Sequence, residues 1–274
     1  MAQISVPTRY YAHFGADYSL AVPAEGFGGW QKTELPLSTE HTALCVMHAW
    51  KNADRGRYPG IWSAVEYLPR AREICENRMP RLLAAFRGAG IHVIHIESGD
   101  YVSRYEAFSH ACALTDGAVK NLRRDSLPPP GSDAVSDELR AFRTAKVHPG
   151  TENLTDIAAA CAERDIDGSV KPAEGELMVT DSDRLQAVCS LYGVNHLIYA
   201  GFALNCCILM SPGGMMQMSE RGFLCSVVGE CTTAVENDFS ARGEWGKKIG
   251  LWHTALFYGF VYEQDDLEKA LKEV

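Results

Sequence analysis

The sequence predicts an α/β fold with a mainly parallel sheet that helices cover on both faces. Short apolar runs of strand length alternate along the chain with longer runs in which the apolar residues have helical spacing. Such alternation is typical of parallel βαβ units. The chain has 274 residues, of which 46% are hydrophobic, so it is long enough to bury a sizeable core without disulfide bonds.

The first predicted unit is a strand, a helix and a second strand. Residues 42–48 form a short apolar run that ends in a polar residue, as expected of a buried parallel strand. Residues 65–89 have helical spacing, and Pro69 and Pro80 within them predict a late start or a kink. A second strand is expected over 91–97.

The second half of the chain repeats this alternation. We expect a third strand over 167–171, a helix from Asp181 or Ser182 to Gly193, a fourth strand over 196–200, a tight turn over 201–206, a helix over 207–221 that is interrupted near 212–214, and a fifth strand over 223–228. The carboxyl ends of parallel strands carry the chemistry of such folds.

The chain divides into an arm and one domain. Residues 1–40 are rich in aromatic residues and glycine without clear periodicity, which predicts an N-terminal arm on the body or on a neighbouring subunit. Residues 41–274 are expected to form a single domain with a long insertion at about 98–150. Long connections are usually lids or oligomer contacts.

Composition disfavours several classes of partner. The net charge of −9 argues against nucleic acid and anionic membranes, and no apolar run approaches the roughly 18 residues that a membrane span needs. The start of the chain lacks the pattern of a secretory signal. The nine cysteines include no C-x-x-C pair, which indicates reduced thiols and a cytoplasmic protein.

Three residues at the predicted strand ends are candidates for a catalytic role. Cys207 lies in the first turn after a strand, where free N–H groups stabilise a thiolate and can hold an oxyanion. His48 ends the first strand and has the pKa range of a general base, although a buried structural histidine fits the position too. Lys171 ends another strand. Its ammonium could stabilise a thiolate or an oxyanion, or the side chain could simply extend into solvent.

Together these residues resemble the isochorismatase-like cysteine hydrolases, which include nicotinamidases, N-carbamoylsarcosine amidohydrolases and ureidoacrylate amidohydrolases. The resemblance covers roughly residues 40–97 and 165–235, and its most specific part is the segment HLIYAGFALNCCI at 196–208. It implies that Cys207 is the nucleophile and that Lys171 is the catalytic lysine. It also implies a non-proline cis peptide at Phe202–Ala203, and an oxyanion hole formed by the N–H groups of Ala203 and Cys207.

The resemblance also implies the architecture, a three-layer α/β/α sandwich around a mainly parallel six-stranded sheet of the isochorismatase-like, Rossmann type. It implies a homo-oligomer, a dimer or tetramer, that acts on a small molecule. One departure is that His48 stands where the family has a catalytic aspartate. Another is that the metal-binding motif of nicotinamidases is not evident. His95 and Glu97 are only a pair, so we expect no metal and no cofactor.

The expected activity is hydrolysis of a C–N bond in a small amide, carbamoyl or ureido compound through a thioester on Cys207, with His48 as the base. We expect Trp50, Phe202 and Tyr101 to contact the substrate. Two alternatives stay open: an isochorismatase-type vinyl-ether hydrolase, and a catalytically silent scaffold or regulatory subunit.

Overall fold

The computed structural model describes residues 3–122 and 133–274, and its centre is one sheet of eight strands. The order across the sheet is β2-β1-β8-β7-β6-β3-β4-β5. The strands are β1 (Gln3–Ala12), β2 (Gly29–Ser38), β3 (Thr42–Met47), β4 (His92–Ile96), β5 (Leu177–Val179), β6 (His196–Gly201), β7 (Leu224–Thr232) and β8 (Val261–Tyr262).

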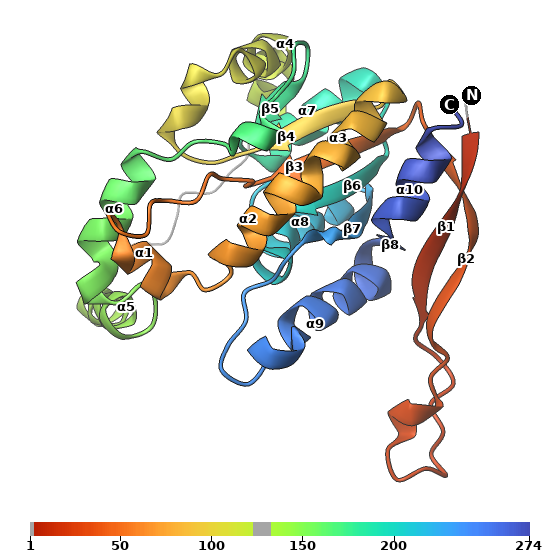
Figure 1. Cartoon of the computed structure of the whole chain (residues 1–274), viewed down its shortest axis with the longest axis horizontal. Helices are drawn as coiled ribbons and strands as arrows, with labels where there is room; N and C mark the ends of the chain where they lie inside the picture. The colour runs from red at the N-terminus through yellow and green to blue at the C-terminus, as the bar shows by residue number, and fades with distance from the viewer. Residues whose placement is uncertain (1–2, 123–132) are drawn as a thin grey trace.

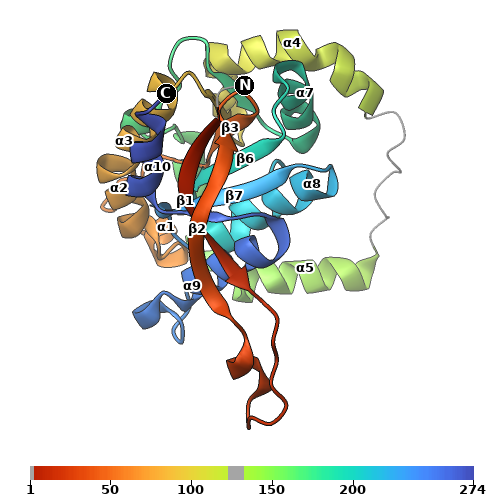
Figure 2. The ribbon, with the colours of Figure 1, turned by 90° about the vertical axis from the view of Figure 1, so that its right-hand side faces the viewer.

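Six of these strands, β8-β7-β6-β3-β4-β5, pair in parallel, and the N-terminal hairpin of β1 and β2 adds two antiparallel strands. The expected six-stranded sheet is therefore too small, because residues 1–40 were predicted to be an arm. The hairpin joins the sheet where Thr8 and Arg9 pair with β8. Figure 2 shows it running along the edge of the sheet, with its tip projecting from the body.

Helices cover both faces of the parallel strands, which confirms the three-layer α/β/α fold class (Figure 1). Leu44 and Val46 of β3 point into one apolar core, and Ala43 and Cys45 point into the other. The first core lies under α2 (Leu68–Asn77), α3 (Met79–Gly88) and α10 (Gln264–Leu271). The second lies under α4 (Glu106–Leu122), α7 (Ser182–Tyr192), α8 (Met215–Glu220) and α9 (Trp245–His253).

Three further helices gather at one end of the molecule, away from the N-terminal hairpin (Figure 1). They are α1 (Pro59–Ala64), α5 (Ala134–Lys146) and α6 (Leu154–Ala162), and α1 packs on α6. Short 3₁₀ and π turns complete the chain: η1 (Pro23–Gly26), η2 (Asp100–Arg104), η3 (Thr151–Asn153), η4 (Gly168–Val170), η5 (Leu204–Ile208), η6 (Ala241–Gly243) and η7 (Thr254–Tyr258).

The helical pattern over 65–89 forms two helices instead of one. Pro69 lies in the first turn of α2 and Pro80 in the first turn of α3, and Arg78 joins them. A proline lacks the N–H group that a helix interior needs, but the first turn does not use that group. Each proline therefore marks the start of a helix.

The strand predicted over 167–171 is wrong. The side chain of Asp167 accepts a hydrogen bond from the Ser169 N–H at 3.0 Å, and residues 168–170 form the 3₁₀ turn η4. An aspartate that bonds to the backbone two residues ahead favours a turn over a strand. The strand on this side of the sheet is β5, the apolar run Leu177–Val179 that pairs with β4.

The helix predicted over 207–221 is broken where expected, near 212–214, but its first part begins earlier. Residues 204–208 form one π-helical turn, and α8 begins at Met215 after Gly214. Gly213 has a φ of +78°, a conformation that favours glycine, so the chain reverses there.

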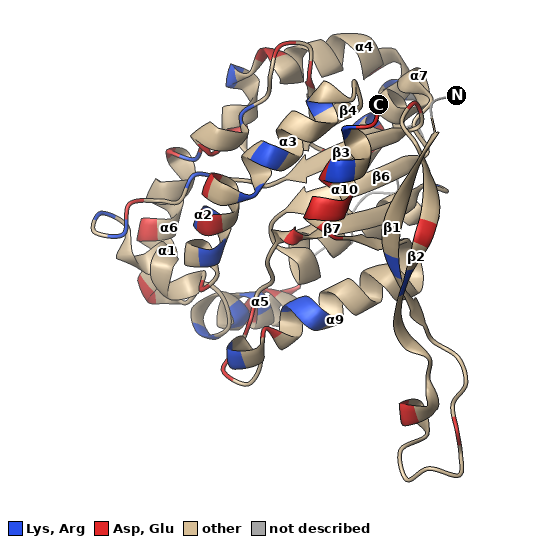
Figure 3. Ribbon diagram, turned by 45° about the vertical axis from the view of Figure 1, so that its right-hand side comes forward, with Lys and Arg blue, Asp and Glu red and all other residues tan. Residues whose placement is uncertain are grey.

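On the face shown in Figure 3, the charged residues of α3 are basic and those of α10 are mostly acidic. The two helices are joined by an ion pair between Arg81 and Asp265, with 2.6 Å between nitrogen and oxygen. In the described part of the chain, no helix has the length and the apolar character that crossing a membrane requires.

Candidate active site

Residues from three neighbouring strands meet at the carboxyl edge of the sheet. His48 directly follows β3, Glu97 directly follows β4, and the turn that carries Cys207 follows β6. β3 is the central strand of the three, since it pairs with β4 on one side and with β6 on the other. The topology therefore brings an imidazole, a carboxylate and a thiol to the same part of the edge.

The turn after β6 depends on a close approach of two backbones. Gly201 has a φ of +117°, and a Cβ atom there would overlap the carbonyl oxygen of Met47. That oxygen accepts a hydrogen bond from the Phe202 N–H at 2.9 Å. The peptide bond between Phe202 and Ala203 is cis, as the resemblance implied.

Cys207 lies in the π turn that follows, and it is partly buried. The carbonyl of Ala203 accepts hydrogen bonds from the N–H groups of Cys206 and Ile208, at 3.2 and 3.1 Å, which hold the turn in place. The expected oxyanion hole, from the N–H groups of Ala203 and Cys207, belongs to this same turn and stays a prediction.

Three side chains stabilise the Cys207 thiolate. Its pKa is lowered from the usual range chiefly by a hydrogen bond from the Cys206 thiol, and also by a hydrogen bond and charge from His48 and by the hydroxyl of Ser211. Burial opposes the shift but is outweighed. The reverse holds for Cys206, whose pKa is raised first by its bond to Cys207. The contacts with His48 and Ser211 favour Cys207 as the thiolate of the pair.

His48 is held in an unusual conformation. Its φ of +50° is left-handed, and its N–H donates to the Ile96 carbonyl of the neighbouring strand at 3.1 Å. The imidazole stacks on the indole of Trp50, with ring centroids 4.6 Å apart. The side chain is buried, and its Nδ1 atom has no hydrogen-bond partner. Non-glycine residues in this conformation are concentrated at functional sites.

Glu97 is a buried carboxylate beside this pair, only 1% exposed. One oxygen, Oε2, accepts hydrogen bonds from Trp50 Nε1 at 2.7 Å and from the Tyr101 hydroxyl at 2.5 Å. The other oxygen, Oε1, has no partner. Burial raises the pKa of Glu97 to about 7, although the charge of His48 and these two donors act in the opposite direction.

The sequence placed Glu97 at the end of a strand, but assigned it a role only with His95, as a weak metal pair. His95 is fully buried and its Nε2 lies 3.0 Å from the Glu176 carboxylate. Among the described residues, no group of three or more His, Cys, Asp or Glu side chains is placed to hold a metal ion. The signal for Glu97 was present in its position, because it ends a strand next to the strand that ends in His48.

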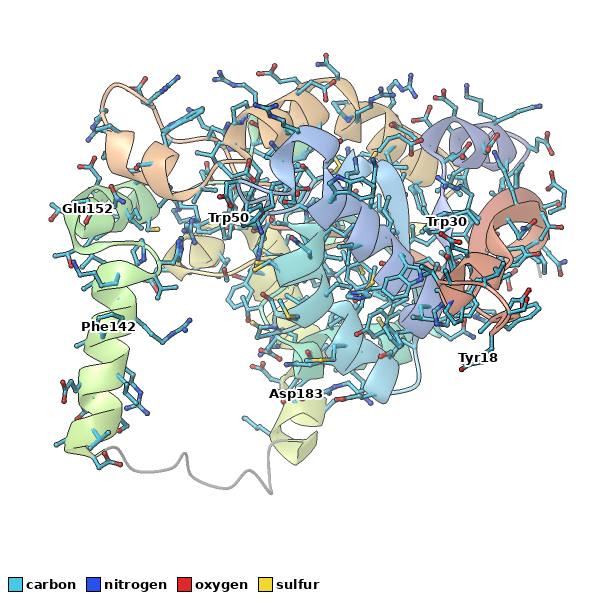
Figure 4. All side chains as sticks on the ribbon, turned by 90° about the horizontal axis from the view of Figure 1, so that it is seen from below. Tyr18, Trp30, Trp50, Phe142, Glu152 and Asp183 are labelled. Atoms are coloured by element: carbon cyan, nitrogen blue, oxygen red, sulfur yellow. The ribbon has the colours of Figure 1, made fainter. Side chains whose placement is uncertain are left out.

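A cavity of about 940 Å³ opens beside His48, Trp50 and Phe202. Tyr67 also lines it, and burial, followed by the charge of Cys207, raises the pKa of this tyrosine. Cys207 itself does not line the cavity. The wall is aromatic and basic. It includes Tyr58 and Trp62, and the cations Lys51, Arg55, Arg57, Arg72 and Arg164. Figure 4 labels Trp50, which lies between the ends of the molecule.

Arg164 has a distinctive place in this wall. Its guanidinium carbon lies 3.8 Å from the centre of a Trp50 ring, and one nitrogen lies 2.8 Å from the sulfur of Cys161. Arg57, in contrast, is paired with Glu163, and Arg72 with Glu76. No carboxylate in the described ranges forms an ion pair with Arg164. Sequence reasoning missed this residue, because it lies in a loop without a recognisable motif.

The structure does not bring Lys171 into this group. Its ammonium is about half exposed and lies 3.2 Å from the Asp165 carboxylate, near the ring of Tyr105. It does not line the cavity. Tyr101 is buried behind Trp50 and does not line the cavity either, whereas Trp50 and Phe202 do.

Comparisons with known proteins establish the fold. No family model matches the chain, and no curated protein does. The structure is similar to that of a cysteine hydrolase from Pseudomonas syringae pv. phaseolicola 1448A, with 13% identity, a TM-score of 0.50, and coverage of 87% of this chain and 96% of that one.

Two further solved structures match. An isochorismatase family protein from Burkholderia thailandensis has 15% identity and a TM-score of 0.47, over 86% of this chain and 97% of that one. An N-carbamoylsarcosine amidase from Thermoplasma acidophilum has 13% identity and a TM-score of 0.41, over 82% and 97%. At such identities a likeness concerns the fold, and the reaction has to be argued from the site.

Proposed function

We propose that the protein hydrolyses a C–N bond in a small amide, carbamoyl or ureido compound through a thioester on Cys207. The observation that carries the proposal is that His48 and the turn bearing Cys207 meet at the ends of the paired strands β3 and β6, next to a cavity that His48 and Phe202 line and that is large enough for a small molecule. A lowered thiol pKa next to an imidazole is the signature of a nucleophilic cysteine.

The reaction has two halves. The Cys207 proton passes to His48, and the thiolate attacks the substrate carbonyl carbon while the N–H groups of Ala203 and Cys207 hold the oxyanion. The C–N bond then breaks, and the amine or ammonia leaves with the proton from His48. Water, deprotonated by His48, next attacks the thioester, which releases the acid and returns the proton to the sulfur.

We give Lys171 no step in this reaction, because its ammonium is engaged by Asp165. A reaction without a catalytic lysine is chemically consistent with a histidine at position 48. In the arrangement that the resemblance implied, an aspartate is the base and the lysine supplies the positive charge beside it. A neutral imidazole accepts the thiol proton and becomes the cation itself. Trp50 and Phe202, which line the cavity, are the proposed substrate contacts.

The test is release of ammonia or amine from a panel of small amides, ureas and carbamates. We expect Cys206→Ala to hydrolyse the same substrates as the wild type, but more slowly at low pH because the thiolate loses a donor, and Cys207→Ala and His48→Gln to lose at least a hundredfold in rate. Intact-mass measurement on the wild type, stopped with acid during turnover, should detect an acyl adduct on Cys207. Full activity of Cys207→Ala would refute the mechanism. Hydrolysis of a vinyl ether in place of the amide panel, without an adduct on Cys207, would favour vinyl-ether chemistry.

A catalytically silent scaffold makes a different prediction. Its Cys207 would react with iodoacetamide near pH 7 no faster than an ordinary cysteine, whereas a thiolate should be alkylated quickly. The same reagent therefore separates the enzyme from the scaffold before any substrate is known.

We also propose a cytoplasmic homo-oligomer, a dimer or tetramer. All nine cysteines are free, which suits a reducing compartment. Helix α5 exposes Val135, Leu139 and Phe142, each more than 60% accessible. Figure 4 shows Phe142 on α5, at the opposite end of the molecule from Tyr18. Analytical ultracentrifugation of the wild type and of Leu139→Lys/Phe142→Lys tests the state, and a monomeric wild type would contradict the proposal.

A further inference from the structure

We infer that Glu97 is the positioning residue of His48, and that the carboxylate, the imidazole and the Cys207 thiol act as one unit across three neighbouring strands. This inference rests on the proposed function, since it assigns the group that orients the base and balances its charge.

The backbone sets Glu97 and His48 side by side. In the pairing of β3 with β4, Met47 lies opposite Ile96, so the next residue of each strand is His48 on one and Glu97 on the other. The His48 N–H continues this ladder through its bond to the Ile96 carbonyl. Registered neighbours on adjacent parallel strands are within side-chain reach of each other.

The unsatisfied atoms complement each other. Nδ1 of His48 and Oε1 of Glu97 are both buried and both lack a hydrogen-bond partner. Buried polar atoms nearly always have a partner, and an imidazole N–H with a carboxylate oxygen is a matched donor and acceptor. A hydrogen bond between these two atoms would satisfy both of them at once.

The rest of the carboxylate is fixed. Trp50 Nε1 and the Tyr101 hydroxyl both donate to Oε2, which keeps the carboxyl group from rotating and leaves Oε1 as its free acceptor. Trp50 also stacks on the imidazole, so one indole orients both partners. Such double support is how proteins hold a base in one tautomer.

The charges support the same arrangement. His48 interacts electrostatically with both Glu97 and Cys207, and its positive charge stabilises the ionised form of each. When His48 takes the thiol proton, the imidazolium therefore lies between a carboxylate and a thiolate. Without the carboxylate, the protonated base would have to be balanced by the thiolate alone in a largely buried place.

The test compares wild type with Glu97→Gln, which keeps size and one acceptor but removes the charge. The readout is the rate of iodoacetamide modification of Cys207 between pH 4 and pH 9, located by peptide mapping. We expect the midpoint of the wild-type profile well below that of a free cysteine. In Glu97→Gln the midpoint should rise by about one unit, which lowers the rate about tenfold at any pH below both midpoints and leaves it unchanged well above them.

Two further variants separate charge from packing. Glu97→Asp should recover part of the wild-type midpoint, because it restores the carboxylate. Tyr101→Phe, which removes one donor to Oε2, should leave the midpoint closer to wild type than Glu97→Gln does. Circular dichroism establishes that each variant is folded. Nitrogen NMR spectra should also show that the His48 ring of the wild type holds its proton at Nδ1 whenever it is neutral.

The outcomes are distinct. A low wild-type midpoint that Glu97→Gln leaves unchanged would overturn the role of Glu97 and leave the proposed hydrolase intact. A wild-type midpoint at the value of an ordinary cysteine would overturn both. If the midpoint shifts as expected but the amide panel shows no turnover, the positioning role stands and the proposed reaction does not.

Discussion

The imidazole of His48 stacks on the indole of Trp50, with the two ring planes 23° from parallel. The same indole donates its N–H to Glu97 at 2.7 Å. One aromatic side chain thus contacts both the base and the buried carboxylate, although it follows β3 by only three residues. The consequence is that changes at Trp50 should depend on the charge of Glu97.

Trp50→Phe tests this dependence, because phenylalanine keeps an aromatic face but has no N–H. The pKa of Glu97 is raised by burial to about 7, so the carboxylate destabilises the fold as pH rises through 7. Loss of a donor to the charged form increases this cost. We expect Trp50→Phe to reduce the free energy of unfolding by about 1–2 kcal/mol more at pH 8 than at pH 6.

Urea unfolding followed by circular dichroism measures both values. Trp62→Phe is the matched control, since Trp62 lines the same cavity and donates to the neutral carbonyl of Ala53 at 2.9 Å. Trp62→Phe should reduce the free energy of unfolding by the same amount at the two pH values. An equal loss for both variants at pH 6 and pH 8 would mean that Glu97 does not titrate in this range.

Adding one methyl group at Gly201, in the turn before Cys207, should strongly reduce the stability of the fold. At Gly201 the φ of +117° and the overlap with the Met47 carbonyl both oppose a side chain. We expect Gly201→Ala to reduce the free energy of unfolding by about 3 kcal/mol or more. The measurement is chemical denaturation at neutral pH.

Gly90→Ala serves as the control for backbone conformation alone. Gly90 has a φ of +68°, and a Cβ atom there would meet nothing within 4 Å. Gly90→Ala should reduce the free energy of unfolding by only about 1 kcal/mol, which is the penalty of an alanine in the left-handed conformation. Equal costs at Gly201 and Gly90 would show that β3 and β6 can separate without loss.

Much of the fold could be predicted from local pattern, because buried parallel strands are short apolar runs. The strands over 42–47, 92–96 and 196–201 lie where the sequence predicted them. The N-terminal hairpin was missed, since β1 and β2 expose much of their length and carry no simple alternation. The strand predicted at 167–171 contains a single apolar side chain, Val170, and Asp167 turns the backbone there.

For the site, local pattern identified the positions that end strands and not the partners that tertiary structure supplies. His48 and Cys207 were found from their places after β3 and β6, and these two strands are neighbours in the sheet. Lys171 was chosen on the same kind of evidence. In the structure it forms an ion pair with Asp165, and no periodicity in the sequence could predict that contact. Arg164 reaches the site through a loop, so only the folded chain reveals it.

Arg164 predicts a preference for substrates that carry an anionic group. It lies on Trp50 in the cavity wall, without an ion-pair partner in the part of the chain that is described. A guanidinium with free donors binds a carboxylate in a bidentate manner. We expect Arg164→Gln to raise KM at least tenfold for amides that bear a carboxylate, with kcat changed less than threefold.

Neutral amides and a second arginine provide the controls. Arg164→Gln should leave KM for uncharged amides unchanged. Arg72→Gln alters another cation of the same wall, which is already paired with Glu76, and should have little effect on either class. If Arg164→Gln affects charged and neutral substrates equally, the residue supports the cavity wall and does not read substrate charge.

A final prediction concerns stability in acid, and it depends on Glu176. Burial acts to raise the pKa of this carboxylate, but hydrogen bonds from His95, Arg87 and the Ala173 N–H lower it to about 2. A carboxyl group whose pKa is depressed on folding stabilises the protein above its unfolded pKa, near 4.5. That contribution is lost as the pH falls toward 2.

Glu176→Gln should therefore reduce the free energy of unfolding by about 2–3 kcal/mol at pH 7, and the difference from wild type should shrink as the pH falls from 5 to 2. Thermal or urea unfolding across this range measures it. Glu163→Gln, which breaks an exposed pair with Arg57, should cost less than about 0.5 kcal/mol at any of these pH values. A difference for Glu176→Gln that persists undiminished at pH 2 would mean that the loss comes from packing around His95, and that the charge of Glu176 contributes nothing to holding β4 and β5 together.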